Sequence, residues 1–249
     1  HTDHRRLRIH WIKPCIASYE EVSKLQMIIS HKYKFIMFLP WKCGSTTCQN
    51  RFNKYNESPY PHSTQFSKIL NKISHKHIHL SDFKKLPESK LDYYKISWIR
   101  NPYDRLYSGF GQRHLRVMIK KDQLDADDAR YVQEGWDSWL ENYMSQSLGT
   151  DEIFGGYGFQ YTHLSDKQYV DFIGRTETMN SDTEKICEHL GLKVNLNKTG
   201  NVKTKFDEVD PMNMKISDYK YIDKYTKNQI KLVNQVYAKD FELFGYKAL

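Results

Sequence analysis

The amino-acid sequence predicts an α/β fold, in which helices flank a central parallel sheet within a single domain over residues 1–249. Two segments, 33–39 and 94–99, have the run of apolar and aromatic side chains that is typical of buried strands. Each leads through a short loop into a helix signal, which is the order of elements in a parallel sheet. No linker divides the chain, and residues 1–30 are expected to form an N-terminal extension that packs on the core.

The helix after the second strand has the clearest start. Asn101 suits an N-cap, Pro102 the first helical position and Asp104 the first turn, so a helix is predicted from Pro102 to about residue 120. Residues 76–80 are a candidate for a further short strand, and residues 169–173 are predicted to form another strand. A glycine-rich loop is expected over residues 149–158.

Two capping boxes predict further helices, one formed by Ser181 with Glu184 and the other by Thr226 with Gln229. The first of these helices should end at Gly191. The second has an apolar stripe, made of Ile230, Val233, Tyr237 and Phe241. Another helix, over residues 136–145, has three aromatic side chains that are expected in the core rather than on a sugar-binding surface: Trp136, Trp139 and Tyr143.

The composition limits the class of protein. A net charge of +8 favours an anionic partner. No apolar run reaches the roughly 18 residues that a membrane span needs. The four cysteines are too few and too scattered for a disulfide scaffold and are expected to be buried free thiols: Cys15, Cys43, Cys48 and Cys187.

The loop after the first strand has the residues of an anion-binding site. A loop that leads from a buried strand into a helix presents backbone N–H groups and the positive end of the helix dipole. Gly44 permits close approach of the backbone, Lys42 adds a positive charge, and Ser45 opens a run of hydroxyls. The sequence does not match the Walker A pattern, because the lysine precedes the glycine.

A second constellation follows the strand at 94–99. Arg100 stands at the strand end, and Ser108 lies eight residues further along. This spacing is close to two helical turns of about 3.6 residues, so the guanidinium and the hydroxyl can converge on one phosphate. Arg105, between them, is expected to brace the structure instead.

Together these segments resemble the PAPS-dependent sulfotransferases (PAPS, 3′-phosphoadenosine 5′-phosphosulfate). The resemblance is closest to the Golgi-type carbohydrate sulfotransferases and their bacterial and algal relatives. It rests on four blocks in order: FLPWKCGSTT (38–47), WIRNPYDRLYSGF (98–110), YVDFIGRTE (169–177) and YAKDFELFGY (237–246). Trp41 departs from the direct Pro–Lys step of the relatives.

The resemblance implies a P-loop-like nucleotide-binding architecture, PAPS as donor substrate, PAP as product and no metal. The 5′-phosphosulfate would be held by Lys42, Cys43, Gly44, Ser45, Thr46 and Thr47, with Lys42 stabilising the leaving oxygen. The 3′-phosphate would be held by Arg100 and Ser108. A loop closing over the nucleotide would contribute Lys198 and Thr199, and their neighbours Lys203 and Lys205 are further candidates.

An acceptor hydroxyl needs a general base. His62, in the segment after the first helix, is the first candidate, because many relatives carry a similar segment facing the acceptor. Glu57 is the second. The alternating residues His75, His77 and His79 are expected on one polar strand face rather than at a metal site, although each also stays open as the base.

A carbohydrate acceptor is expected, with a small hydroxylated metabolite or a tyrosine as the alternative. A basic nucleic-acid-binding module is a remote alternative, because no aromatic–basic interleaving is found. Asn197 begins a glycosylation sequon inside the expected closing loop, where a glycan would hinder closure. We therefore expect a cytoplasmic protein, or one in the Golgi lumen if an N-terminal anchor has been removed.

Overall fold

The computed structural model describes residues 27–58, 65–70, 72–74, 77–119, 126–149, 160, 164, 167–199 and 221–249. Within these residues the main sheet has the strand order β1-β2-β5-β6, and a hairpin, β3-β4, forms a second small sheet. β2 pairs with β5 and β5 with β6 in parallel, whereas β1 is antiparallel to β2. The strands are β1 (Ile28–Ser30), β2 (Phe35–Phe38), β3 (Gln65–Ser67), β4 (Lys72–Ser74), β5 (Tyr94–Ile99) and β6 (Phe172–Arg175).

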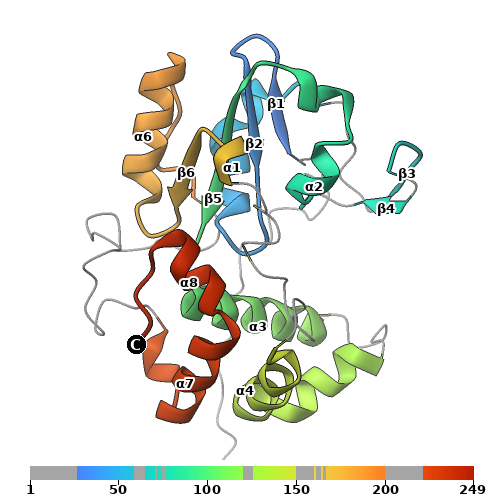
Figure 1. Ribbon diagram of the computed structural model, residues 1–249, viewed down its shortest axis with the longest axis vertical. Helices are drawn as coiled ribbons and strands as arrows, with labels where there is room; N and C mark the ends of the chain where they lie inside the picture. The colour runs from blue at the N-terminus through green and yellow to red at the C-terminus, as the bar shows by residue number, and fades with distance from the viewer. Residues whose placement is uncertain are drawn as a thin grey trace, which may run out of the picture.

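Helices surround this sheet, which confirms the α/β fold (Figure 1). In Figure 1, α3, α4, α7 and α8 gather beyond the ends of β2 and β5 at which the parallel strands finish. The α-helices are α1 (Ser45–Phe52), α2 (Leu80–Phe83), α3 (Pro102–Ile119), α4 (Ala126–Ser147), α6 (Met179–Leu190), α7 (Lys227–Val236) and α8 (Ala238–Phe244). The 3₁₀ helices are η2 (Asn53–Tyr55), η3 (Pro87–Lys90), η4 (Lys167–Tyr169) and η6 (Ile222–Lys224).

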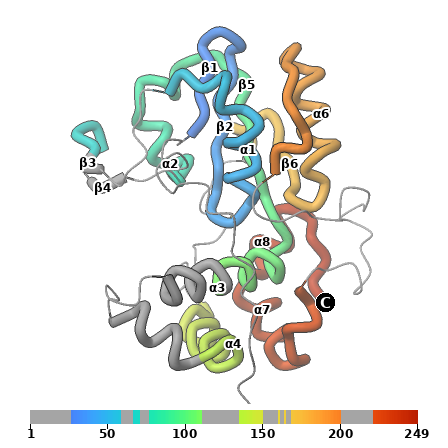
Figure 2. Tube along the Cα trace, turned by 180° about the vertical axis from the view of Figure 1, so that it is seen from behind, coloured from blue at the N-terminus to red at the C-terminus, as the bar shows by residue number. Residues whose placement is uncertain are grey.

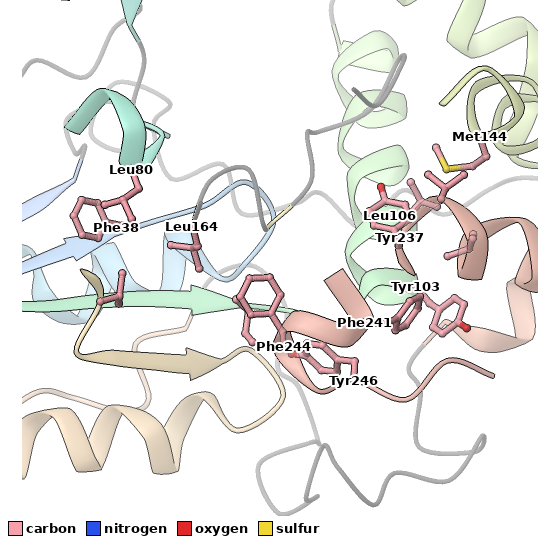
Figure 3. Packing of buried hydrophobic residues seen from close by; sticks show 14 of the residues in the cluster. Phe38, Leu80, Tyr103, Leu106, Met144, Leu164, Tyr237, Phe241, Phe244 and Tyr246 are labelled. Carbon is pink, nitrogen blue, oxygen red and sulfur yellow. The ribbon is translucent and has the colours of Figure 1, made fainter. Parts of the chain in front are cut away.

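The two faces of β2 pack into different clusters of buried side chains. Phe35 and Met37 pack in a cluster that also contains residues of α1 and α6, and Figure 2 shows those helices beside β2 and β6. Ile36 and Phe38 pack in a larger cluster with residues of α2, α3, α4, α7 and α8 (Figure 3). A strand covered on both faces needs apolar residues at successive positions, which explains its continuous apolar pattern.

Several predicted helix ends are confirmed. The Asn101 side-chain oxygen accepts a hydrogen bond from the Tyr103 N–H at 3.0 Å, as an N-cap does. Thr226 and Gln229 form the expected capping box at the start of α7. Gly191 ends α6 with a left-handed φ of 64°.

The capping box predicted at Ser181 is wrong, because α6 begins two residues earlier, at Met179. The buried carboxylate of Asp182 accepts hydrogen bonds from the Thr178 hydroxyl at 2.7 Å and from the Arg175 N–H at 2.9 Å. The Ser181 hydroxyl donates to the Thr178 carbonyl at 3.1 Å, from inside the first turn. Asp182 therefore ties the first turn of α6 back to the end of β6 and to Thr178, the residue before the helix.

The structure also corrects the N-terminal part of the sheet. The strand predicted at 33–39 is β2, preceded by β1. Residues 28–30, which were assigned to an extension, are thus an edge strand of the sheet. The pairing of Ile29 with Ile36 across a short turn makes this edge, and it was missed because a strand of three residues has too little periodicity to detect.

Two other predicted strands differ from the structure. Within 76–80, the described residues 77–79 are not in a strand and Leu80 opens α2. The expected strand face of alternating histidines therefore does not exist. The strand predicted at 169–173 is β6, shifted to Phe172–Arg175, because Tyr169 closes the 3₁₀ helix η4.

The remaining predictions concern the helical region. Trp139 and Tyr143 lie in the core, and Trp136 packs against it partly buried, as expected. The apolar stripe predicted after Thr226 lies on two helices rather than one. α7 ends at Val236 and α8 begins at Ala238, so Tyr237 lies between them. Residues 150–158 of the predicted glycine-rich loop lie outside the described residues. In the described part of the chain, no helix combines the length and apolarity needed to cross a membrane.

Candidate functional site

The loop between β2 and α1 turns sharply at the carboxyl end of β2. The Cys43 N–H donates to the Pro40 carbonyl at 3.4 Å, and both Lys42 and Gly44 have left-handed φ angles, of 63° and 74°. Gly44 is the N-cap of α1, and among the described side chains none caps this helix start. The structure thus has the strand–loop–helix order and the glycine at the start of α1 that the sequence predicted, and the anion site itself stays a prediction.

Gly44 also allows the β6–α6 connection to approach the loop closely. A Cβ atom at this position would lie 2.3 Å from Cε of Met179 and 3.8 Å from the side chain of Thr176. The positive φ and the lack of space both favour glycine here. The loop is thus packed against the first residue of α6.

Arg100 lies beside this loop. Its Nη1 donates to the Lys42 carbonyl at 3.4 Å, and its guanidinium lies 5.9 Å from the centroid of the Tyr221 ring. The buried Arg105 donates from Nε to the Trp41 carbonyl at 2.9 Å, which confirms that it braces the loop. Two arginines from the β5–α3 segment therefore hold the β2–α1 loop by its backbone.

Gln160 is a site residue that the sequence did not reveal. Its buried side chain accepts from the Arg100 N–H at 2.7 Å, donates to the Arg100 carbonyl at 2.8 Å, and accepts from the Cys43 thiol at 3.3 Å. Asp240 orients it by accepting from its backbone and side-chain nitrogens at 3.0 and 3.3 Å. A lone glutamine gives no pattern, although Asp240 lies in the block at 237–246.

Glu177 is a second buried polar residue next to the site. It accepts from the Asn101 N–H at 2.6 Å and from the Tyr246 hydroxyl at 2.8 Å. Burial raises the pKa of this carboxyl, while the Asn101 N–H and the Arg100 charge oppose the rise. Glu177 thus ties the start of α3 to the C-terminal segment.

The expected contacts of the 5′-phosphosulfate differ in exposure. Ser45, Thr46 and Thr47 form the first turn of α1, and all three are at least partly exposed. Cys43 is buried, its Sγ also lies 3.4 Å from the Trp41 carbonyl oxygen, and burial raises its pKa to about 11. The Cys43 thiol therefore stays protonated near neutral pH and faces the protein interior. Cys43 and Cys48 are buried free thiols, as expected, whereas the free thiol Cys187 is only partly buried, and Cys15 lies outside the described residues.

Ser108 and the expected closing loop lie on other elements than the β2–α1 loop. Ser108 lies in the second turn of α3 and is partly exposed. The carbonyls of Lys198 and Thr199 accept hydrogen bonds from Arg51 and Asn50 of α1, at 3.2 and 3.1 Å. The closing segment therefore lies along the helix that begins at the loop. Lys203 and Lys205 lie outside the described residues.

The structure separates the candidate bases. His62 and His75 lie outside the described residues. Glu57 accepts from the Ser30 hydroxyl and from the N–H groups of His31 and Lys32, and the Lys32 N–H, the largest of these effects, lowers its pKa. The Glu57 carboxylate is therefore bound to the β1–β2 turn, at the end of β2 opposite the β2–α1 loop.

His77, by contrast, contacts the loop. The buried ring donates from Nδ1 to the Leu39 carbonyl and lies against the Trp41 ring, with centroids 3.9 Å apart. His79 is partly exposed just before α2. Among the described residues, no group of three or more His, Cys, Asp or Glu side chains is arranged to hold a metal ion.

The fold is an α/β fold in which the β2–α1 loop and the start of α1 lie at the carboxyl ends of parallel strands. A model of the sulfotransferase family matches residues 25–247. The chain therefore belongs to the sulfotransferase family, as its resemblance to the Golgi-type carbohydrate enzymes implies. No curated protein and no solved structure matches it.

Proposed function

We propose that this sulfotransferase moves the sulfuryl group of PAPS to a hydroxyl of a carbohydrate acceptor. The observation that carries the proposal is the contact between Arg100 and the Lys42 carbonyl, at 3.4 Å. It joins the two segments that resemble the phosphosulfate and 3′-phosphate motifs into one cationic region. This region lies where ligands of parallel α/β sheets bind.

The residues present fit a donor with phosphate groups at both ends. Gly44 begins α1 without a side chain of its own, and in the proposal the first N–H groups of this helix bind the anion. In the proposal, the first turn of α1 and Lys42 hold the 5′-phosphosulfate, and Arg100 with Ser108 holds the 3′-phosphate. The guanidinium and hydroxyl pair suits a terminal phosphate.

The proposed reaction forms a bond between the acceptor oxygen and sulfur while the bond from sulfur to the phosphate oxygen breaks. Such transfers pass through a loose transition state, so the protein mainly positions the groups and stabilises the charge that develops. Lys42 would stabilise the phosphate oxyanion of the leaving PAP. The acceptor proton would pass to a general base.

We propose His77 as this base, with His62 as the candidate from sequence order. In a neutral ring whose Nδ1 donates to the Leu39 carbonyl, Nε2 is the nitrogen that accepts a proton. His77 also contacts the loop that carries Lys42, through Trp41. Among the described histidines, His31 and His189 pack instead against Tyr93 and Tyr94.

A carbohydrate acceptor is favoured by the family resemblance and by the net charge of +8, which suits an anionic glycan. The test is to incubate the full chain with radiolabelled PAPS and a panel of acceptors. The panel comprises neutral and anionic glycans, small alcohols and a tyrosyl peptide. Label in a glycan supports the proposal, whereas label only in a small alcohol or in tyrosine would correct the acceptor.

The control for this assay is Lys42→Ala. Its rate should fall by about 10²–10³, as when an oxyanion-stabilising donor is lost. Immobilised PAP should retain the wild-type chain. A chain that neither binds PAP nor transfers label to any acceptor would contradict the proposed function.

A further inference from the structure

The buried guanidinium of Arg51, near the end of α1, holds two separate parts of the chain. Its Nη2 and Nε donate to the carbonyls of Leu196 and Lys198, at 2.7 and 3.2 Å. The same side chain reaches the start of α6, where its acceptors are the Met179 carbonyl, the Thr183 hydroxyl and the Asn180 side chain. Arg51 therefore links α1, α6 and the segment at 195–199.

The contacts on either side of Arg51 give this segment a direction. The Tyr55 hydroxyl, after α1, exchanges hydrogen bonds with the backbone of Lys193, at 2.7 and 3.0 Å. Asn50, one residue before Arg51, donates to the Thr199 carbonyl at 3.1 Å. As its residue numbers rise, the segment thus runs back along α1 towards Gly44.

The hydrogen bonds from Arg51 to α6 also connect to the start of α1 at Gly44. Arg51 donates to the carbonyl of Met179, whose Cε occupies the space left by the missing side chain of Gly44. One side chain therefore fixes a neighbour of the anion-binding helix start and also the segment that approaches it.

We propose that Arg51 and Asn50 are positioning residues that hold the 195–199 segment on α1 and so set the affinity for the donor nucleotide. The inference rests on the proposed function and on the family resemblance, which implies that Lys198 and Thr199 contact that nucleotide. A segment that is already ordered costs less entropy to bring onto a ligand than a loose one. Arg51 and Asn50 act through the segment and do not themselves touch the donor.

The geometry explains why residue 51 is an arginine. A guanidinium carries five N–H donors in a planar fork, whereas an ammonium group is a compact charge with three. Arg51→Lys keeps the positive charge but cannot reach all of these acceptors. Asn50→Ala is the gentler change, because Asn50 is exposed and its removal leaves the core intact.

The test measures PAP affinity, together with kcat and the KM for PAPS, in the full chain. Asn50→Ala and Arg51→Lys should raise the Kd for PAP and the KM for PAPS by roughly three- to tenfold, with kcat nearly unchanged. The matched control is Asn53→Ala, an exposed asparagine three residues further along, which should bind PAP as the wild type does. Amide hydrogen exchange should be faster at 195–199 in the two test variants alone.

Two outcomes separate the claims. If Asn50→Ala and Arg51→Lys fold but bind PAP as tightly as the wild type, the positioning role is wrong and the proposed function stands. If the wild type itself does not bind PAP, the proposed function fails and the affinity claim fails with it. Unchanged exchange at 195–199 would also overturn the inference.

Discussion

Gln160 and Arg100 form a closed pair of hydrogen bonds between one side-chain amide and one stretch of backbone. The Arg100 N–H donates to Oε1 of Gln160 at 2.7 Å, and Nε2 of Gln160 donates to the Arg100 carbonyl at 2.8 Å. The arginine that we propose for the 3′-phosphate is therefore fixed at its backbone by a residue from a distant part of the sequence. Cys43 and Asp240 complete the contacts of this amide.

We expect Gln160→Ala to lower the free energy of unfolding by about 1–3 kcal/mol, because it removes the side-chain partner of the partly buried N–H and carbonyl of Arg100. PAP affinity should fall as well, because Arg100 loses its anchor. Urea denaturation measures the first effect and calorimetry the second. Gln146→Ala, on the exposed face of α4, is the control and should change stability by less than about 0.5 kcal/mol. Wild-type stability in Gln160→Ala would show that the pair is not stabilising.

Arg100→Ala and Arg105→Ala should have different effects on thermal unfolding. PAP should raise the Tm of the wild type, since a ligand that binds only the folded state stabilises it by mass action. Arg100→Ala should lose most of this shift. Arg105→Ala should instead lower the Tm without ligand, because the buried Arg105 braces the Trp41 carbonyl. A full PAP shift in Arg100→Ala would mean that the 3′-phosphate binds elsewhere.

The choice between His77 and His62 can be tested with matched variants. His77→Asn retains a side-chain N–H for the Leu39 carbonyl but cannot accept a proton, so kcat should fall by about 10²–10⁴ while PAP affinity stays unchanged. Raising the pH should recover part of the rate. A nearly normal kcat in His77→Asn, together with an inactive His62→Ala, would make His62 the base.

Gly44→Ala should be destabilising and should weaken PAP binding. The left-handed φ of 74° costs a residue with a Cβ about 1–2 kcal/mol, and the added Cβ must also displace the Met179 side chain. Gly191→Ala is the matched control, because it has a φ of 64° but nothing within 4 Å of the added Cβ. We expect a larger loss of stability in urea unfolding for Gly44→Ala than for Gly191→Ala, because only the first adds a steric clash to the backbone strain, and weaker PAP binding only in Gly44→Ala. Equal PAP affinity in the two variants would contradict a ligand site at Gly44.

Glu177 should make stability depend on pH. Because burial raises its pKa in the folded state above the ordinary value of about 4.3, the folded protein holds this proton more tightly than the unfolded chain. Its contribution is fully present below the ordinary pKa and is lost as the pH rises through the raised one. Unfolding free energies measured from about pH 4 to 8 should therefore decline less in Glu177→Gln than in the wild type. Parallel pH profiles would contradict this.

Local sequence was enough to determine the parts of the fold that depend on neighbouring residues. The apolar run that became β2, the Asn101 cap and the Thr226–Gln229 capping box each need only a few consecutive positions. The same holds for the loop around Gly44, whose glycine and hydroxyls stand side by side in the chain. These features, with the family blocks, predicted the α/β fold and the position of the β2–α1 loop.

Only the tertiary structure determined which distant residues support that loop. Gln160 reaches Arg100 across 60 residues and Arg51 reaches Lys198 across 147, and neither has a pattern in its own neighbourhood. His77 was expected on a strand, but it packs against Trp41 because the loop carbonyl of Leu39 needs a donor there. Glu57 was a candidate base, but its carboxylate accepts hydrogen bonds from the backbone amides of the β1–β2 turn, at the opposite end of β2. Buried polar groups must be hydrogen-bonded, and their partners can come from distant parts of the chain. Which partner each group has therefore depends on the tertiary fold and cannot be read from the local sequence.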